Sequence, residues 1–261
     1  MARILITGSS DGLGHNLAKS LIAQGHAVTL HARSAERAKE TMSKTPGASS
    51  ILVADLSSIA QTKKLALEAN AIGVFDTVVH NAGVGYGQAF QRTEDGIAQL
   101  FAVNALAPYI LTTLMERPKR LVYVSSSLHT GGNESMADLG WREKKWDGFQ
   151  AYGDSKLLDL ILALGVARHW PKVSSNAVDP GWVKTKMGGS SAPDSLKKCD
   201  DMLVWLATGD QKDIGSGKYY IAQGGKGGQH PAPSDQSVQE EFLRVCEEIS
   251  GVKFPTVVPP R

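Results

Sequence analysis

Short apolar runs alternate with longer segments of helical spacing along most of the chain, and this alternation limits the folds open to it. The runs predicted as strands are Arg3–Ile6, Ala27–His31, Ser50–Ala54, Thr77–His80, Arg120–Ser125 and Ser175–Val178. Several are apolar at consecutive positions, as strands buried on both faces of a parallel sheet are. Helical spacing is found in Leu13–Gln24, Ile59–Asn70, Gly96–Met115 and Ala151–Trp170. The alternation predicts an α/β fold, a doubly wound parallel sheet with helices on both faces.

Composition and charge narrow the function classes. The 261 residues contain no repeat or linker that would divide them, so residues 1–261 are predicted to form one domain. The 28 Lys and Arg nearly balance the 26 Asp and Glu, which argues against a nucleic-acid partner. Two cysteines suit a reducing compartment, and no apolar run is long enough for a membrane span. The chain enters its first strand without a signal-peptide pattern, so we expect a cytoplasmic protein.

A glycine-rich turn joins the first strand to the first helix. It reads Thr-Gly-Ser-Ser-Asp-Gly-Leu-Gly over residues 7–14. Glycines at such a turn let a pyrophosphate approach the N–H groups at the helix N-terminus, which makes the predicted sheet Rossmann-type. The alternative is a strand-to-helix turn without a ligand. The residues expected at the cofactor are Gly8, Ser10, Asp11, Gly12, Leu13 and Gly14.

The end of the second predicted strand bears on the choice of dinucleotide. An acidic residue there would bind the 2′-hydroxyl of NAD, whereas Arg33 suits the 2′-phosphate of NADP. NADP(H) is therefore expected over NAD(H), although Arg33 and Arg37 could also be solvated charges at a helix start. Asp55 and Leu56 follow the third strand, where the Asp55 carboxylate could accept from an adenine amino group. The alternative for Asp55 is an N-cap of the next helix.

Polar residues gather where several strands end. Tyr152 and Lys156 are four residues apart on a helical pattern and share one face, so the lysine could lower the pKa of the tyrosine. Three serines, Ser125–Ser127, follow the fifth strand, residues 81–83 follow the fourth, and residues 179–185 follow the sixth. Each of these groups alone could serve only to form a turn. Together, at the carboxyl edge where open α/β sheets bind ligands, they predict one active site.

These motifs together resemble the short-chain dehydrogenase/reductase superfamily. The matching residues are Thr7-Gly8-x-x-x-Gly12-x-Gly14, Asn81-Ala82-Gly83, Asn104, Ser126, Tyr152-x-x-x-Lys156 and Pro180-Gly181-x-Val183-x-Thr185. The resemblance implies that Tyr152 is the general acid or base, that Lys156 lowers its pKa and holds the nicotinamide ribose, and that Ser126 orients the carbonyl. It implies that Asn104 fixes a water in the proton relay. It places Asn81, Ala82, Gly83, Pro180, Gly181, Val183 and Thr185, with Tyr152 and Lys156, along the cofactor.

The stretch between Ser126 and Tyr152 is longer than in many members of that superfamily, and resembles the retinol-dehydrogenase-like and protochlorophyllide-reductase-like members. Segments 127–150 and 184–200 are therefore expected to cover the substrate. Candidate substrate contacts are Tyr86, His129, Trp182 and Met187, which favour a small lipophilic molecule. Ordinary packing is the alternative for the apolar residues, and a surface or loop-anchoring role is the alternative for His129. No metal ligand is assigned.

The resemblance implies an NADP(H)-dependent oxidoreductase that interconverts a carbonyl and an alcohol. Two alternatives remain open: a catalytically idle NADP(H)-binding scaffold or sensor, and a redox-neutral isomerase or cyclase on the same fold. The helix after Tyr152 is apolar nearly all round, from Leu157 to Val166. Such a helix is either deeply buried or forms a subunit contact, and we expect a homodimer.

Overall fold

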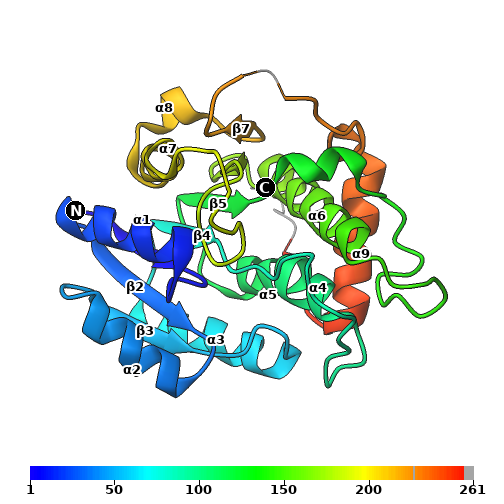
Figure 1. Cartoon of the computed structure of the whole chain (residues 1–261), viewed down its shortest axis with the longest axis horizontal. Helices are drawn as coiled ribbons and strands as arrows, with labels where there is room; N and C mark the ends of the chain where they lie inside the picture. The colour runs from blue at the N-terminus through cyan, green and yellow to red at the C-terminus, as the bar shows by residue number, and fades with distance from the viewer. Residues whose placement is uncertain (226, 256–261) are drawn as a thin grey trace, which may run out of the picture.

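The computed structural model describes residues 1–225 and 227–255. Its centre is a seven-stranded parallel sheet in the order β3-β2-β1-β4-β5-β6-β7 (Figure 1). The strands are β1 (Arg3–Ile6), β2 (Ala27–Ala32), β3 (Ser50–Val53), β4 (Thr77–His80), β5 (Arg120–Val124), β6 (Ser174–Asp179) and β7 (Tyr219–Ile221). The six predicted strands are confirmed to within a residue or two. The predicted α/β class and the doubly wound parallel sheet are confirmed as well.

Helices connect the strands and cover both faces of the sheet. They are α1 (Gly12–Ala23), α2 (Ala35–Lys44), α3 (Ile59–Ile72), α4 (Gln99–Phe101), α5 (Ala107–Leu114), α6 (Gly148–His169), α7 (Leu196–Thr208), α8 (Gln211–Ile214) and α9 (Gln236–Ser250). Helices α1 and α7 pack together against one face, and α3, α5 and α6 lie against the other. Among the described residues, no helix is both long and apolar enough to cross a bilayer.

The single helix predicted over Gly96–Met115 is interrupted. A π-helical turn, Ala102–Leu106, separates α4 from α5 and carries Asn104. Pro108 stands four residues after Asn104, so it cannot supply the N–H that an α-helix would donate to the Asn104 carbonyl. Single π turns inside helices are often found at functional sites. The break therefore has a local cause in the sequence and lies at a predicted catalytic residue.

Two predicted loop regions are partly helical. The last residues of segment 184–200 belong to α7, whose N-cap is Ser195. The stretch 223–238 is rich in Gly, Pro and Ser, a composition that predicts a surface loop, but its described residues include a 3₁₀ turn over Ala232–Ser234 and the start of α9. Asp235 caps α9 by accepting from the Ser237 N–H. Asp is a preferred N-cap residue, so it was a sequence signal for the start of this helix, but the loop-like composition around it outweighed that signal.

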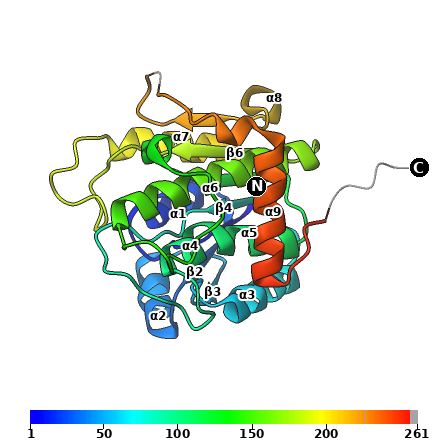
Figure 2. The same cartoon turned by 90° about the vertical axis from the view of Figure 1, so that its right-hand side faces the viewer.

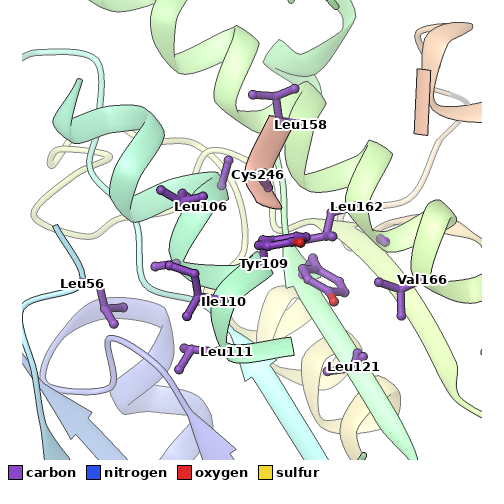
Figure 3. Packing of buried hydrophobic residues seen from close by; sticks show 14 of the residues in the cluster. Leu56, Leu106, Tyr109, Ile110, Leu111, Leu121, Leu158, Leu162, Val166 and Cys246 are labelled. Atoms are coloured by element: carbon purple, nitrogen blue, oxygen red, sulfur yellow. The ribbon is translucent and has the colours of Figure 1, made fainter. Parts of the chain in front are cut away.

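The larger core lies between the sheet and α3, α5 and α6. Figure 3 shows Tyr109 of α5 near Leu162 of α6, with Ile110 on the side toward Leu56, and Cys246 of α9 belongs to the same cluster. The Tyr109 hydroxyl donates to the carbonyl of Val252, 2.7 Å away, so the buried ring keeps a polar partner. This packing fixes α6, and therefore Tyr152 and Lys156, against the sheet.

Helix α9 covers the outer side of α6 (Figure 2). Arg168 near the end of α6 donates to the Gln239 side chain at 2.8 Å and pairs with Glu240. Residues 157–163 of α6 are all buried within this one chain. The sequence of α6 is apolar on nearly all sides, which fits either deep burial or a subunit contact. Burial within this one chain accounts for the pattern. That pattern no longer supports a second subunit.

The segment after α9 is anchored by a buried tryptophan. Trp170 is 1% exposed, stacks on Phe254 with ring centroids 5.0 Å apart, and donates from its indole N–H to the Pro255 carbonyl. Trp170→Ala should lower the free energy of unfolding by about 3–5 kcal/mol, because it empties a filled site. Trp182→Ala, at a half-exposed ring, should cost less than about 1 kcal/mol. Equal losses for both variants in chemical denaturation would contradict this packing argument.

Candidate active site

The glycine-rich turn after β1 is held in shape by β4. Gly8 has a φ of +62°, and a Cβ there would lie 2.7 Å from the Ala82 Cα, so only glycine fits. The Asn81 amide donates to the carbonyls of Thr7 at 2.9 Å and Gly8 at 3.1 Å. The Thr7 hydroxyl in turn accepts from the Asn81 and Ala82 N–H groups. These contacts bring together the two motifs that the sequence predicted at the cofactor.

A residue absent from the predicted site also holds this turn. The buried His31 ring accepts from the Gly8 N–H at 2.9 Å through Nδ1, and its Nε2 lies 3.0 Å from the Ala54 carbonyl. Burial lowers the His31 pKa to about 4, so the ring is neutral and donates to Ala54 from Nε2. His31 therefore joins the phosphate turn to the end of β3. Its position at the end of β2 was the only sequence signal.

Charged residues surround the start of α1. Asp11 caps the helix by accepting from the Gly12 N–H at 2.8 Å. Its carboxylate pairs with Lys186, and Arg37 lies 3.9 Å away and also reaches the Ser10 hydroxyl. Lys186 holds the pKa of Asp11 below its usual value, although burial opposes the shift. Two cations beside first-turn N–H groups that lack helical acceptors fit a dinucleotide phosphate.

Of the glycines in this turn, Gly14 has the least room for a side chain. A Cβ there would lie 2.4 Å from the Asn81 Nδ2 and 2.8 Å from the Gly8 carbonyl oxygen. Gly14→Ala should therefore lower the free energy of unfolding by about 1–3 kcal/mol and weaken NADPH binding, despite the better helix propensity of alanine. Denaturation and NADPH fluorescence titration measure both effects. Gly131→Ala, where a Cβ would meet nothing within 4 Å, is the control.

Arg33, Asp55 and Leu56, also predicted at the cofactor, lie just after β2 and β3. Arg33 is exposed just after β2. Asp55 accepts from the N–H and hydroxyl of Ser57 through Oδ1, whereas α3 is capped by Ser58. The N-cap alternative for Asp55 is therefore wrong. The Leu56 side chain is buried in the core, so it can offer a ligand only its backbone.

The two catalytic candidates on α6 share a face, as their spacing predicted. The Lys156 Nζ lies 5.7 Å from the centroid of the Tyr152 ring, and both side chains are buried. Ser126 follows β5, and its hydroxyl accepts from the Leu128 N–H at 3.3 Å, which caps a 3₁₀ turn over Ser127–Gly131. Ser126 also lies close enough to Tyr152 to lower the pKa of its hydroxyl. Tyrosine, lysine and serine thus meet at the carboxyl edge of the sheet.

Burial controls the ionisation of Tyr152. Burial raises the pKa of Tyr152, and Asp159 adds to the shift, whereas Lys156 and Ser126 lower it. Lys156 therefore acts in the predicted direction, but the net pKa lies above the usual value of 10.0. The difference arises because sequence spacing reveals the neighbouring charge and not the loss of water. A raised pKa keeps Tyr152 protonated at neutral pH, the form that can donate a proton.

Asn104 lies in the π-helical turn and fixes the loop after β4. Its Oδ1 accepts from the Val84 N–H at 2.7 Å, and its amide donates to the Val84 carbonyl and the Ser155 hydroxyl. Gly83 separates Asn104 from the lysine: a Cβ at Gly83 would lie 3.6 Å from the Asn104 Oδ1 and 3.8 Å from the Lys156 Nζ. The structure thus brings all four predicted catalytic residues into one region.

The segment after β6 returns to the phosphate turn. Gly181 has a φ of +82°, and its N–H donates to the Asp179 carboxylate at 2.9 Å, which turns the chain at Pro180. Val183 is buried, and a Cβ at Gly12 would lie 3.5 Å from the Thr185 methyl group. Residues 180–185 therefore lie between β6 and the start of α1, along the edge where the sequence placed the cofactor.

Several apolar side chains near Tyr152 or in the segments after β4 and β6 are exposed. Tyr86 is 44% exposed and meets the Tyr152 ring edge-on, with centroids 5.7 Å apart. Trp182 and Met187 are 52% and 51% exposed, and a Cβ at Gly85 would lie 2.9 Å from the Met187 Cγ. Phe149, also exposed, packs on Tyr86. Three of the four predicted substrate residues are thus accessible to a ligand.

His129 is the exception. It is fully buried, its Nδ1 lies 2.7 Å from the Ser126 carbonyl, and its Nε2 accepts from the His230 N–H at 3.4 Å. With both nitrogens engaged in this way, Nδ1 carries the proton and no donor remains for a substrate. The prediction of a substrate contact is therefore corrected in favour of the loop-anchoring alternative, in which His129 fixes the strand end that carries Ser126.

Comparison with known proteins agrees with this geometry. The short chain dehydrogenase family model matches residues 2–137. A short-chain dehydrogenase of Penicillium rubens is 45% identical over 98% of this chain and all of its own length. A Streptomyces protein named for daunorubicin C-13 ketoreduction is 30% identical over 83% of this chain and 82% of its own. Human retinol dehydrogenase 13 is 26% identical over 97% and 86%, respectively.

Solved structures share the fold at lower identity. A protein of Mycobacterium paratuberculosis superposes with a TM-score of 0.83 at 22% identity, over 98% of this chain and 95% of its own. The RhlG/NADP complex of Pseudomonas aeruginosa gives a TM-score of 0.67 at 20% identity, over 86% and 95%. The chain therefore belongs to the short-chain dehydrogenase/reductase family, and it is similar to the retinol dehydrogenases among its members.

Proposed function

We propose that this protein interconverts a carbonyl and an alcohol on a small lipophilic substrate, with NADP(H) as cofactor and Tyr152 as general acid or base. The observation that carries the proposal is the buried Tyr152 side chain beside Ser126 and Lys156, with the exposed Tyr86 ring packed edge-on against it. The cytoplasm is the expected compartment, since Cys199 and Cys246 are buried free thiols.

The proton chemistry follows from the positions of three side chains. In reduction, the Tyr152 hydroxyl donates its proton to the carbonyl oxygen, and the Ser126 hydroxyl donates a hydrogen bond to the same oxygen as negative charge develops. Lys156 stabilises the tyrosinate that remains, because its charge lowers the pKa of Tyr152. When bound, the reduced nicotinamide supplies the hydride for the carbonyl carbon. In oxidation, Tyr152 accepts the proton instead.

The preference for NADP(H) is supported by two arginines at the start of α2. Arg33 is exposed directly after β2, and Arg37 reaches back to the Ser10 hydroxyl at 3.5 Å. Arginine binds phosphate through several N–H donors at once, whereas NAD would require an acceptor for its 2′-hydroxyl. From the sequence, Arg37 was expected only as a solvated charge. Its contact with Ser10 of the phosphate turn makes it a second candidate to bind the 2′-phosphate of NADP.

A lipophilic substrate is supported by Tyr86, Trp182, Met187 and Phe149, all exposed. Aromatic and other apolar side chains are the usual lining of sites that bind apolar ligands. The Streptomyces relative is named for ketoreduction, which is consistent with a carbonyl substrate.

The proposal is tested by following NADPH absorbance with a panel of ketones, aldehydes and alcohols, from apolar ring systems to sugars. We expect turnover with apolar carbonyls and much slower turnover with sugars. NADPH binding without turnover of any carbonyl or alcohol would favour the idle scaffold or the redox-neutral enzyme. Turnover with NADH at equal efficiency would contradict the cofactor preference.

A further inference from the structure

A carboxylate that no motif predicted lies beside the catalytic lysine. Asp159 follows Lys156 by three residues on α6, and its Oδ2 is 2.9 Å from the Lys156 Nζ. The two side chains are only 3% and 6% exposed. Burying an ion pair costs desolvation energy that the mutual attraction does not always repay. A buried ion pair that includes a predicted catalytic lysine therefore points to a role of Asp159 in the active site.

The hydrogen bonds of Lys156 show what the contact does. An ammonium group has three N–H donors. One donates to the Val124 carbonyl at 2.7 Å, and a second donates to Asp159. Only one donor remains, on a nitrogen that lies 5.7 Å from the Tyr152 ring and would be 3.8 Å from a Cβ at Gly83. The remaining donor is therefore the one available to the active site.

We propose that Asp159 is a positioning residue: it keeps the buried Lys156 ammonium charged and, with the Val124 carbonyl, directs its last free donor toward Tyr152 and the predicted cofactor site. The inference rests on the proposed role of Lys156 beside Tyr152. It adds a residue that touches neither substrate nor cofactor and acts only through the lysine.

The charges around the pair are consistent with this role. Burial alone would lower the pKa of Lys156, but Asp159 and Tyr152 raise it above its usual value. Burial raises the pKa of Asp159 to about 6, so its carboxylate is ionised at neutral pH. From the neighbouring strands, Tyr123 of β5 lies in the field of Asp159, and Asp179 of β6 acts on Tyr152. Lys156 is the cation whose charge acts on both Tyr152 and Asp159.

Asp159→Asn tests the proposal without a substrate. If Asp159 keeps Lys156 charged, the variant lysine loses its proton at lower pH, and Tyr152 loses a neighbour that lowers its pKa more than Asp159 raises it. Tyr152 should then ionise at higher pH than in the parent. Its titration is isolated as the difference in tyrosinate absorbance between each protein and the same protein with Tyr152→Phe. A Tyr152 pKa that falls or stays unchanged would overturn the proposal.

A second readout is the affinity for NADPH as a function of pH. Asp159→Asn should lose about tenfold as pH rises over a range where the parent affinity is constant, which is the contribution of one charge-assisted hydrogen bond. Asp76→Asn is the matched control, because it breaks a Lys–Asp contact of 2.8 Å at the opposite edge of the sheet. Parallel pH profiles for the parent and both variants would contradict the assigned role.

The parent protein allows a measurement that does not depend on how the variant folds. The ε-carbon NMR signal of Lys156, assigned by its loss in Lys156→Arg, should stay in the protonated form at a pH where exposed lysines have titrated. Titration of Lys156 below the ordinary lysine range would overturn the proposal. None of these measurements requires turnover, so failure of the carbonyl panel would reject the proposed reaction and leave this test intact.

Discussion

Tyr152→Phe should lower kcat for carbonyl reduction by about 10²–10⁴-fold, the usual contribution of a positioned general acid. The substitution removes only the hydroxyl, and phenylalanine can keep the edge-on contact with Tyr86. The phosphate turn and Lys156 are unchanged, so NADPH affinity should be nearly that of the parent. Steady-state kinetics with a carbonyl from the panel and NADPH fluorescence titration measure the two quantities separately.

Tyr220→Phe is the matched control for this prediction. The Tyr220 hydroxyl donates to the Ile214 carbonyl beside β7, away from Lys156 and Ser126. Its removal should leave kcat unchanged. A Tyr152→Phe enzyme that reduces the carbonyl at the parent rate would remove Tyr152 from the mechanism, whereas a loss of NADPH binding would show that the hydroxyl supports the cofactor site instead.

The parts of the site that the sequence predicted correctly are those set by local spacing. Tyr152 and Lys156 share a helix face because they are one turn apart, and the glycine turn follows β1 directly. The carboxyl ends of parallel strands meet at one edge, so residues 81–83 and 180–185 were expected near that turn. Each of these relations needs only the period of an element and the rule for parallel sheets.

Two of the features that were missed depend on contacts between distant segments. His31 binds Gly8 and Ala54 across three strands, and nothing near it in the sequence marks that contact. Helix α9 packs on α6, and the Arg168–Gln239 contact between them joins residues more than 70 positions apart in the sequence. From the sequence alone, a helix that is apolar on nearly all sides could therefore equally have indicated a dimer. Asp159 differs from these two, because its partner Lys156 is only three residues away on the same helix; that spacing was visible in the sequence, but the burial of the pair was not.

Arg33 and Arg37 should each contribute about tenfold to NADPH affinity, and Arg33→Ala with Arg37→Ala should weaken it by about a hundredfold. The reason is that a 2′-phosphate accepts charge-assisted hydrogen bonds that a 2′-hydroxyl does not. NADH affinity should therefore change little. Arg33→Asp should go further and favour NADH, because a carboxylate accepts from the 2′-hydroxyl and repels the phosphate.

The ratio of the two affinities, rather than either value, decides whether these arginines select the cofactor. Arg37 also lies 3.9 Å from Asp11 in the phosphate turn, so its loss could disturb pyrophosphate binding, which NADH and NADPH share. Equal weakening of both dinucleotides would assign Arg37 to the turn, and an unchanged ratio in Arg33→Asp would leave Arg33 a surface charge. Lys39→Ala, at an exposed position of the same helix, should alter neither affinity and controls for the general loss of positive charge.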